Sequence, residues 1–363
     1  MKVAIAHDWL NQIGGAENVL EVLVSMFPGA PIFTTIYAPD LMPPAYKSWD
    51  VRPSWLNRAP AIHRRHQSYL PLYPAAVRSL DLRGYDLILS NKSGFIHGLK
   101  TEAGQLHLCY CLSPTRYVWD YHAYAARERL GPIARGLLAP MVAALRRWDY
   151  QAARRVDHFC AISSDIQRRI KTYYGRESEI IPPPVDTDRF QPVPDPSEDY
   201  YFIVSRLIPY KRIDLAVQAF TQMGKRLIIT GEGRDREALQ TMAGPSIEFT
   251  GRLSWSEVAR LMANCKAFIF PGCEDFGMTP VEAQAAGRPV IAFAAGGALD
   301  TVVDQETGIF FHQQTVASLI EAVQCLEAAA FDDQCIRQNA ERFSVTRFKQ
   351  NLRDWIRQYV DLK

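Results

Sequence analysis

Residues 266–293 constrain the fold of this 363-residue chain more than any other stretch. An apolar run at 267–270 predicts a buried strand, and a loop over 271–279 follows it. Pro280 then stands where the first turn of a helix tolerates proline, and the helix predicted over 281–286 stops at Gly287. A second strand is predicted over 289–293. This order of strand, loop, helix and strand is typical of parallel α/β sheets.

Two carboxylates follow the first of these strands, with seven residues between them. Glu274 lies in the loop, and Glu282 lies in the first turn of the predicted helix. Both can face the crevice at the carboxyl ends of the strands, where open α/β sheets bind their ligands. Each also has a simpler explanation, because Glu282 favours the helix dipole and Glu274 suits a solvated loop.

Backbone groups near this pair indicate a ligand that carries an anion. Gly277 lets the backbone approach a ligand closely. The free amides of Met278 and Thr279 point at the helix N-terminus, which suits an anion. A loop that offers amides to a phosphate and carboxylates to hydroxyl groups fits a nucleotide sugar.

Two cations stand just before another predicted helix. Arg206 and Lys211 precede the helix predicted over 213–220. Positive charges at a helix N-terminus oppose its dipole, so they are costly there unless an anion lies between them. The pair therefore indicates an anion site, with two exposed charges as the alternative.

The stretch 266–293 resembles the signature of family-4 glycosyltransferases of the GT-B fold. The resemblance rests on nine residues: Glu274, Phe276, Gly277, Pro280, Glu282, Ala283, Gly287, Pro289 and Val290. It implies that Glu274 contacts the donor sugar, that Glu282 holds the ribose, and that Arg206 and Lys211 clamp the diphosphate. Catalytic roles follow for Arg206, Lys211 and Glu274. The donor-binding residues that we predict are Gly14, Gly15, Gly231, Gly233, Leu253, Phe276, Gly277, Met278, Thr279 and Glu282.

Gly14 and Gly15 follow the strand predicted over 2–7 and precede a helix. Their amides suit a phosphate or an acceptor, and a tight turn explains the pair equally well. In the family, the corresponding glycine loop lies near the donor phosphates and the acceptor.

Residues 111–122 resemble a subset of the family in which a histidine precedes Ser/Thr-Pro-x-Arg-Tyr. Leu112 stands at the place of that histidine, so we assign no catalytic histidine. The nearby histidines, for which a structural role is the alternative, are His97, His107 and His122. Arg116 is predicted to contact the acceptor or another anion, with a structural salt bridge as the alternative.

Three consecutive prolines at 182–184 predict a domain boundary. We expect a Rossmann-like, acceptor-binding domain over 1–183, with a C-terminal helix at 344–363 that crosses back onto it. A second Rossmann-like domain over 184–343 is expected to bind the nucleotide sugar. The resemblance implies that these two parallel-sheet domains face each other across a cleft. Asp186 and Asp188 follow the linker, and we interpret them as turn and cap chemistry, so no metal site is predicted.

Composition limits the partners and the compartment. Arginines concentrate at 52–83 and 127–155 among tryptophans and tyrosines, which indicates an anionic surface such as lipid head groups or, alternatively, a solvated helix face. No nucleic-acid module is evident. The seven cysteines lack metal spacing, no apolar run reaches about 18 residues, and no signal-peptide layout is present. We expect a cytoplasmic protein with peripheral contact at the inner face of the plasma membrane.

These observations and the resemblance predict a retaining, metal-independent hexosyltransferase without a cofactor. It would move a hexose from GDP-mannose or UDP-glucose to a saccharide or lipid-linked saccharide acceptor in polysaccharide or lipopolysaccharide synthesis. Two other functions stay open. A nucleotide-sugar epimerase of similar build would need no acceptor, and a non-catalytic nucleotide-sugar-binding protein would turn nothing over.

Overall fold

The computed structural model describes residues 1–121, 125, 131–193 and 199–360. The chain divides into two compact units. Unit 1 comprises Met1–Pro182 and Lys349–Lys363, and unit 2 comprises Pro183–Phe348. Within the described residues, no helix is both long enough and apolar enough to span a bilayer.

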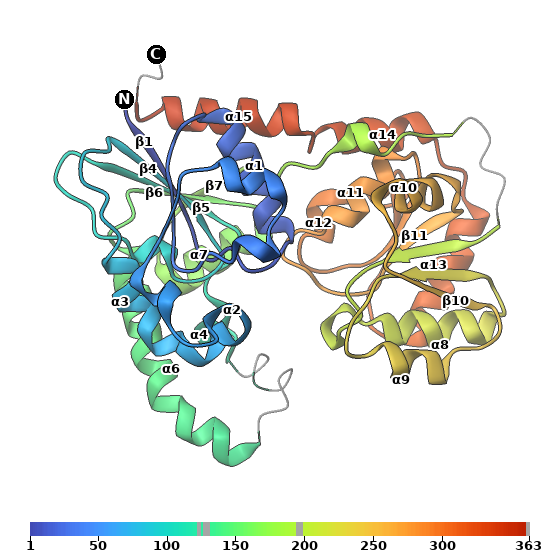
Figure 1. Cartoon of the computed structure of the whole chain (residues 1–363). Coiled ribbons are helices and arrows are strands. Elements are labelled where there is room, and N and C mark those ends of the chain that lie inside the picture. Colours follow the sequence, from blue (N-terminus) through green and yellow to red (C-terminus); the bar gives the residue numbers. More distant parts are fainter. Residues whose placement is uncertain (122–124, 126–130, 194–198, 361–363) are drawn as a thin grey trace. The chain divides into compact units, whose positions relative to one another are not determined.

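Unit 1 contains a seven-stranded parallel sheet in the order β3-β2-β1-β4-β5-β6-β7 (Figure 1). Its strands are β1 (Val3–His7), β2 (Ile32–Thr34), β3 (Val51–Pro53), β4 (Leu87–Lys92), β5 (Leu106–Cys111), β6 (His158–Ala161) and β7 (Ser178–Ile180). Its α-helices include α1 (Gly15–Met26), α2 (Ile62–Arg65), α3 (Tyr73–Arg78), α4 (Arg116–Trp119), α6 (Pro132–Ala153) and α7 (Ser164–Tyr174), and the 3-10 helix η4 covers His66–Leu72. The central strands β4 and β5 are almost wholly buried, as parallel strands covered on both faces must be.

Unit 2 contains a six-stranded parallel sheet in the order β10-β9-β8-β11-β12-β13. Its strands are β8 (Tyr201–Val204), β9 (Leu227–Thr230), β10 (Ile247–Gly251), β11 (Ala267–Phe270), β12 (Val290–Phe293) and β13 (Gly308–Phe311). Its helices include η6 (Thr187–Arg189), η7 (Pro209–Lys211), α8 (Ile213–Met223), α9 (Arg236–Met242), α10 (Trp255–Asn264), α11 (Met278–Ala285), α12 (Ala298–Thr301), α13 (Val316–Ala328) and α14 (Asp333–Glu341). Figure 1 shows α8, α9 and α13 on one side of this sheet and α10, α11 and α12 on the other. The predicted α/β class with two parallel sheets is confirmed.

The helix after β11 begins earlier than the sequence predicted. α11 begins at Met278 and not at Val281, with Gly277 as its left-handed N-cap residue at φ 87°. Pro280 is therefore the third helical residue, where its missing N–H costs nothing because the first N–H groups of a helix have no partner within it. As a result Glu282 lies in the second turn and not in the first turn.

The final helix, α15 (Val345–Arg357), spans the division between the two units. Its C-terminal part belongs to unit 1, where Trp355 is buried. Just beyond the helix, the ring of Tyr359 stacks on that of His158 with 3.7 Å between centroids. The end of the chain therefore packs against the start of β6 in the unit 1 sheet.

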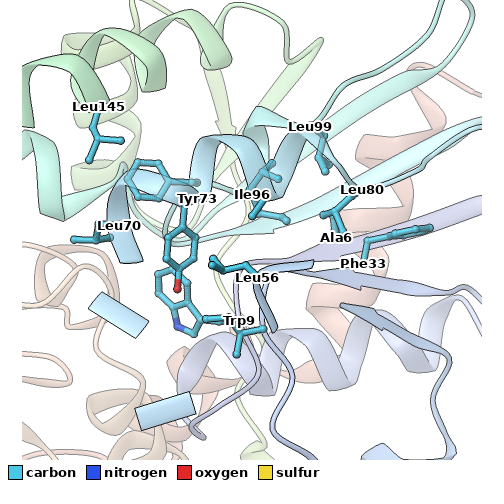
Figure 2. Close-up of a cluster of buried hydrophobic side chains, with 14 of the residues drawn as sticks. Ala6, Trp9, Phe33, Leu56, Leu70, Tyr73, Leu80, Ile96, Leu99 and Leu145 are labelled. Atoms are coloured by element: carbon cyan, nitrogen blue, oxygen red, sulfur yellow. The ribbon is translucent and has the colours of Figure 1, made fainter. Parts of the chain in front are cut away.

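The core of unit 1 is rich in aromatic side chains (Figure 2). Trp9, directly after β1, packs edge-on against Tyr73, with ring centroids 5.8 Å apart. Tyr73 in turn lies 5.9 Å from Phe95. These rings connect α3 to the loops that follow β1 and β4.

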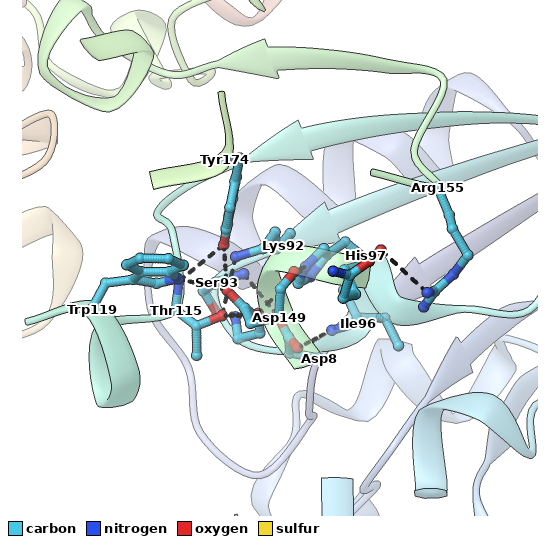
Figure 3. Close-up of polar contacts among 12 residues, drawn as sticks. Asp8, Lys92, Ser93, Ile96, His97, Thr115, Trp119, Asp149, Arg155 and Tyr174 are labelled. Atoms are coloured by element: carbon cyan, nitrogen blue, oxygen red, sulfur yellow. Dashed lines mark hydrogen bonds and ion pairs between the residues drawn. The ribbon is translucent and has the colours of Figure 1, made fainter. Parts of the chain in front are cut away.

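A carboxylate fastens two loops at the carboxyl edge of the unit 1 sheet (Figure 3). Asp8, which follows β1, is almost completely buried. It accepts hydrogen bonds from the backbone N–H groups of Ser93 at 2.7 Å, Gly94 at 2.6 Å and Ile96 at 2.8 Å. These three donors lie in the loop after β4. The loops after β1 and β4 are therefore held together by a single side chain.

A second buried carboxylate holds α4, α6 and α7 together (Figure 3). Asp149 of α6 accepts hydrogen bonds from Thr115 Oγ1 at 2.7 Å, Trp119 Nε1 at 2.7 Å and Tyr174 Oη at 2.8 Å. Burial raises the pKa of Asp149, and the charge of Lys92 opposes that rise. Lys92 is itself fully buried and donates to Ser113 O at 3.0 Å.

Replacing the carboxylate between the two loops tests how much it stabilises unit 1. Asp8→Ala leaves the buried N–H groups of Gly94 and Ile96 and the half-buried one of Ser93 without their acceptor, so we expect a loss of about 3 kcal/mol in the free energy of unfolding. Denaturant unfolding monitored by tryptophan fluorescence measures this loss. Asp81→Ala, which removes an exposed carboxylate, is the control and should leave the midpoint unchanged. Equal midpoints for the two variants would contradict the role given to Asp8.

Candidate functional site

The strand order of unit 2 reverses between β8 and β11, and most predicted donor-site residues cluster there. From β8 the chain proceeds outward to β9 and β10, then returns to the other side of β8 with β11. The loops after β8 and β11 therefore leave the sheet in opposite directions, which opens a crevice at the carboxyl edge. A hollow of about 10 Å³, roughly the space of one water molecule, lies between them and is lined by residues that include Ser205, Lys211, Gly272 and Glu274.

An ion pair joins these two loops. Lys211 Nζ, at the end of η7, contacts Glu274 Oε1, and both side chains are largely buried. The backbones also meet closely, because a Cβ on Gly272 would lie 2.9 Å from Lys211 Cα and 3.0 Å from Tyr210 O. The structure thus brings together the cation and the carboxylate that the sequence predicted separately. Two groups of opposite charge are fixed side by side, one suited to a phosphate and the other to hydroxyl groups.

The second predicted cation, Arg206, lies exposed in the loop between β8 and η7. Its Nη2 donates to Tyr210 Oη at 3.2 Å, and Lys211 Nζ lies 5.4 Å from the centroid of the same ring. Tyr210 therefore contacts both cations. Arg206 is exposed to solvent, whereas Lys211 is held in its ion pair.

Gly231 and Gly233 lie directly behind this loop. A Cβ on Gly231 would clash with the carbonyl oxygen of Ser205, and a Cβ on Gly233 would clash with that of Leu207. Leu207 N donates to Glu232 O at 2.9 Å. Only glycine allows this approach of the two backbones, so the pair supports the loop that carries Arg206.

The N-terminus of α11 faces the same edge of the sheet. Its N-cap residue is Gly277, which has no side chain to cap it, and the half-buried Met278 and Thr279 begin its first turn. Gly297 N donates to Glu274 O at 2.9 Å, which links the loop after β12 to the loop after β11. The ring of Phe276 is buried and packs edge-on against Phe343, so this side chain supports the loop from behind.

Glu282 is a buried carboxylate that lacks a full set of partners. It is 7% exposed, and its Oε2 makes no hydrogen bond to any residue that the structure describes. Burial raises its pKa to about 7; the charge of Arg189 lowers it and that of Asp186 raises it. A buried carboxylate without donors is costly, which indicates a ligand that supplies them.

Two further predictions concern unit 2. Leu253, half-buried, follows β10 and so lies at the carboxyl edge with the others. Asp186 forms an ion pair of 2.9 Å with Arg189, and its side chain does not cap η6. The interpretation of Asp186 as a helix cap is therefore wrong, because its carboxylate pairs with the arginine three residues on.

The other predicted residues belong to unit 1. Gly14 is the N-cap residue of α1 and Gly15 is its first residue, at the carboxyl end of β1. The carboxylate of Glu17, in the first turn, lies over Gly14, where a Cβ would meet its Oε2 at 3.5 Å. This turn therefore already holds a negative charge close to its amides.

Sequence reasoning missed the polar group around Glu17. Glu17 and His7 are both buried, and Glu17 Oε1 lies 3.3 Å from His7 Nε2. Asn91 Nδ2 lies 3.2 Å from His7 Nδ1 and donates to Ala16 O at 2.8 Å. The residues come from β1, α1 and β4, so only the strand order brings them together.

Arg116 opens α4, half-buried, and its Nε donates to Ser113 Oγ at 3.3 Å. His97 is fully buried against Asp149, and burial holds its pKa well below the usual range. His107 bonds Ser90 Oγ at 2.8 Å, and burial lowers its pKa to about 4. Both histidines are neutral parts of the fold, and His122 lies outside the described residues.

Two family models match the chain almost end to end. The model described as "Glycosyltransferase Family 4" matches residues 13–189, and "Glycosyl transferases group 1" matches residues 184–343.

Curated relatives match over part of their length. A GDP-mannose-dependent alpha-(1-6)-phosphatidylinositol monomannoside mannosyltransferase of Mycolicibacterium smegmatis is 30% identical over 251 residues, 57% of this chain and 65% of that protein. The glycogen synthase of Mycobacterium tuberculosis is 28% identical over 253 residues, 64% of this chain and 58% of that protein. The chain thus spans less than two thirds of either relative in these matches.

Solved structures share the fold. Alr3699/HepE of Anabaena, in complex with UDP, aligns with a TM-score of 0.71 at 18% identity, covering 99% of this chain and 100% of that one. Sucrose-phosphate synthase of Thermosynechococcus elongatus aligns with a TM-score of 0.74 at 19% identity, covering 99% of each chain. Together with the two parallel sheets and the family models, these matches show that the chain belongs to the family-4 glycosyltransferases, glycosyl transferases group 1, of the GT-B fold.

Proposed function

We propose that the chain is a retaining glycosyltransferase that moves a hexose from a nucleotide-diphospho-sugar to a saccharide or lipid-linked saccharide acceptor. The observation that carries this proposal is the Lys211–Glu274 ion pair at the reversal of strand order in unit 2. A nucleotide sugar has a diphosphate next to a hydroxyl-bearing ring, and this pair offers one group to each. The proposal includes that no metal ion is required.

The chemistry follows from where negative charge develops. The bond between the anomeric carbon and the diphosphate oxygen breaks, and its electron pair stays on the diphosphate. Lys211, Arg206 and the amides of Met278 and Thr279 are the donors assigned to that charge. The acceptor hydroxyl bonds to the anomeric carbon on the face that the diphosphate leaves, and its proton passes to the leaving phosphate oxygen. Retention of configuration follows from this route.

Glu282 is assigned to the ribose. Its unpartnered Oε2 can accept a hydrogen bond from a ribose hydroxyl, which removes the cost of the buried charge. Glu274 is assigned to the hydroxyls of the transferred sugar.

The relatives support two donors. One acts on phosphatidylinositol monomannoside with GDP-mannose, and HepE was crystallised with UDP-glucose. We therefore keep GDP-mannose and UDP-glucose as the donors of this proposal. The first relative also supports a lipid-linked acceptor.

Removing the exposed cation should slow transfer. Arg206→Ala deletes a donor assigned to the leaving diphosphate, and we expect turnover to fall roughly 100-fold with a smaller change in donor affinity. Steady-state kinetics with varied donor measures both quantities. The control is Arg226→Ala, since Arg226 is also exposed but precedes β9 at the opposite edge of the sheet. Equal turnover of Arg206→Ala and the wild type would remove this role.

Donor binding should depend on pH through Glu282. With a pKa of about 7, the carboxyl group is mostly ionised at pH 8 and mostly protonated at pH 6. The protonated form accepts poorly from ribose, so affinity for the nucleotide sugar should be about tenfold weaker at pH 6 than at pH 8. Calorimetry with UDP-glucose and with GDP-mannose measures the affinity at both pH values and identifies the donor. The same titrations with a chelator test whether binding requires a metal ion. Glu282→Gln should bind weakly at both values. An unchanged affinity in that variant would mean that the ribose site has been misplaced.

The same carboxylate should destabilise the ligand-free protein. Its folded-state pKa lies above the ordinary value, so ionisation opposes folding, and stability falls as pH rises from about 4.5 through about 7. Glu282→Gln should therefore be more stable than the wild type by about 1–3 kcal/mol at pH 8, and nearly equal to it below pH 5. Thermal unfolding at the two pH values measures the difference, and Glu237→Gln on exposed α9 is the control. If the Glu282→Gln variant is less stable than the wild type at pH 8, the ionised carboxylate does not destabilise the ligand-free protein.

A further inference from the structure

An apolar pocket of about 430 Å³ lies in unit 1, between η4 and α6. Its walls are mostly aliphatic or aromatic, with Leu70 on η4 and Leu145 on α6 among them, and Figure 2 shows these two leucines near each other on separate elements. Its polar lining includes Gln67 and Ser68, both exposed. Pockets for small ligands have about this composition and a volume of about 300–1,000 Å³.

Apolar surface continues from this pocket along α6. Ile133, Leu137 and Met141 follow one another at intervals of four residues, which places them on one face of the helix. Met141 lines the pocket and is half-buried, whereas Ile133 is 81% exposed and Leu137 is 77% exposed. Two large apolar side chains in water beside an apolar pocket indicate a long apolar ligand.

Two of the segments that form the pocket, residues 51–80 and α6, carry positive charge almost exclusively. Asp120, which stands between the lining residues Tyr117 and Tyr121, is paired with Arg169. Residues 51–80, which include η4, contain five arginines and no aspartate or glutamate. Arg64 and Arg65 are exposed and stand just before Gln67 and Ser68. On α6 the single acid is Asp149, whose carboxylate is buried and bonded to three donors. The charge around the pocket therefore complements an anionic head group.

We propose that this pocket binds the hydrocarbon chain of the glycosyl acceptor, an amphiphile whose phosphate group faces Arg64 and Arg65. The statement that the amphiphile is the acceptor rests on the proposed function. The binding of its chain does not, because it requires neither donor nor turnover.

Binding of alkyl phosphates below their micelle concentrations tests the pocket. We expect affinity to rise about fourfold per added methylene from hexyl to dodecyl phosphate, as burial of a hydrocarbon chain requires. Inorganic phosphate should not compete at equal concentration. Affinity that is independent of chain length would overturn the proposal, since it would indicate recognition of the head group alone.

Two substitutions separate the pocket from the rest of the surface. Met141→Asp places a charge in the pocket, and Ser68→Trp narrows it from an exposed position, so each should weaken dodecyl phosphate binding at least tenfold. Met242→Asp, at an exposed methionine of unit 2, should leave it unchanged. If Met141→Asp does not fold, Ser68→Trp alone decides, and wild-type affinity in that variant would overturn the proposal.

Nucleotide-sugar binding in the same variants keeps the two proposals apart. Normal donor binding together with length-independent alkyl binding refutes the pocket and leaves the transferase proposal standing. Alkyl phosphate binding that depends on chain length, without any donor binding, supports the pocket and refutes the transferase proposal. Self-association of the wild type that Met141→Asp abolishes, without alkyl binding, would assign the face to a second copy and overturn the proposal.

Discussion

The reversal of strand order in each parallel sheet is the constraint on which the rest of the structure depends. In unit 1 the reversal lies between β1 and β4, and in unit 2 it lies between β8 and β11. Two loops must separate at each reversal, and each unit joins them again with a charged side chain. Asp8 binds three amides of the opposite loop, whereas Lys211 meets a carboxylate, Glu274. The first connection satisfies every donor internally and suits a scaffold. The second can exchange partners with a ligand, and this difference favours unit 2 as the place of chemistry.

The two predicted glutamates, Glu274 and Glu282, differ in how their negative charge is compensated inside the protein. The charge of Glu274 is compensated by Lys211, and under the proposed function the diphosphate competes with Glu274 for that lysine. Among the described residues no donor bonds Glu282 Oε2, and the charge of Arg189 offsets the effect of burial only in part, so the pKa of Glu282 is raised. A protein under selection for stability alone would replace this carboxylate with an amide or an apolar group. Its presence is best explained by a ligand whose hydroxyl groups donate hydrogen bonds to it. Functional sites commonly retain groups that destabilise the ligand-free protein in this way.

The sequence predicted those parts of the fold and site that depend on local pattern. Apolar runs located the strands around β11, and the spacing of Glu274 and Glu282 placed both near the carboxyl edge. Local pattern could not locate the start of α11, because proline is tolerated at several positions of a first turn. It also could not pair Asp8 with residues 93–96, or His7 with Glu17 and Asn91, since these contacts arise from the strand order. Histidine spacing was equally uninformative, because burial against Asp149 and Ser90 made His97 and His107 structural.

The surroundings of Leu112 bear on whether another histidine of unit 1 can take the catalytic place that Leu112 occupies. It stands where a subset of the family has a histidine, and neither His97 nor His107 can replace that group, because both are buried and their lowered pKa values keep them neutral. Both histidines are already bonded to neighbours in the core of unit 1, His97 to Asp149 and His107 to Ser90. The proposed function accordingly assigns stabilisation of the leaving diphosphate to unit 2, where Arg206 is exposed and Lys211 is paired with a carboxylate. A reaction whose proton passes to its own leaving phosphate needs no other base, so the loss of a histidine at this position is compatible with transfer.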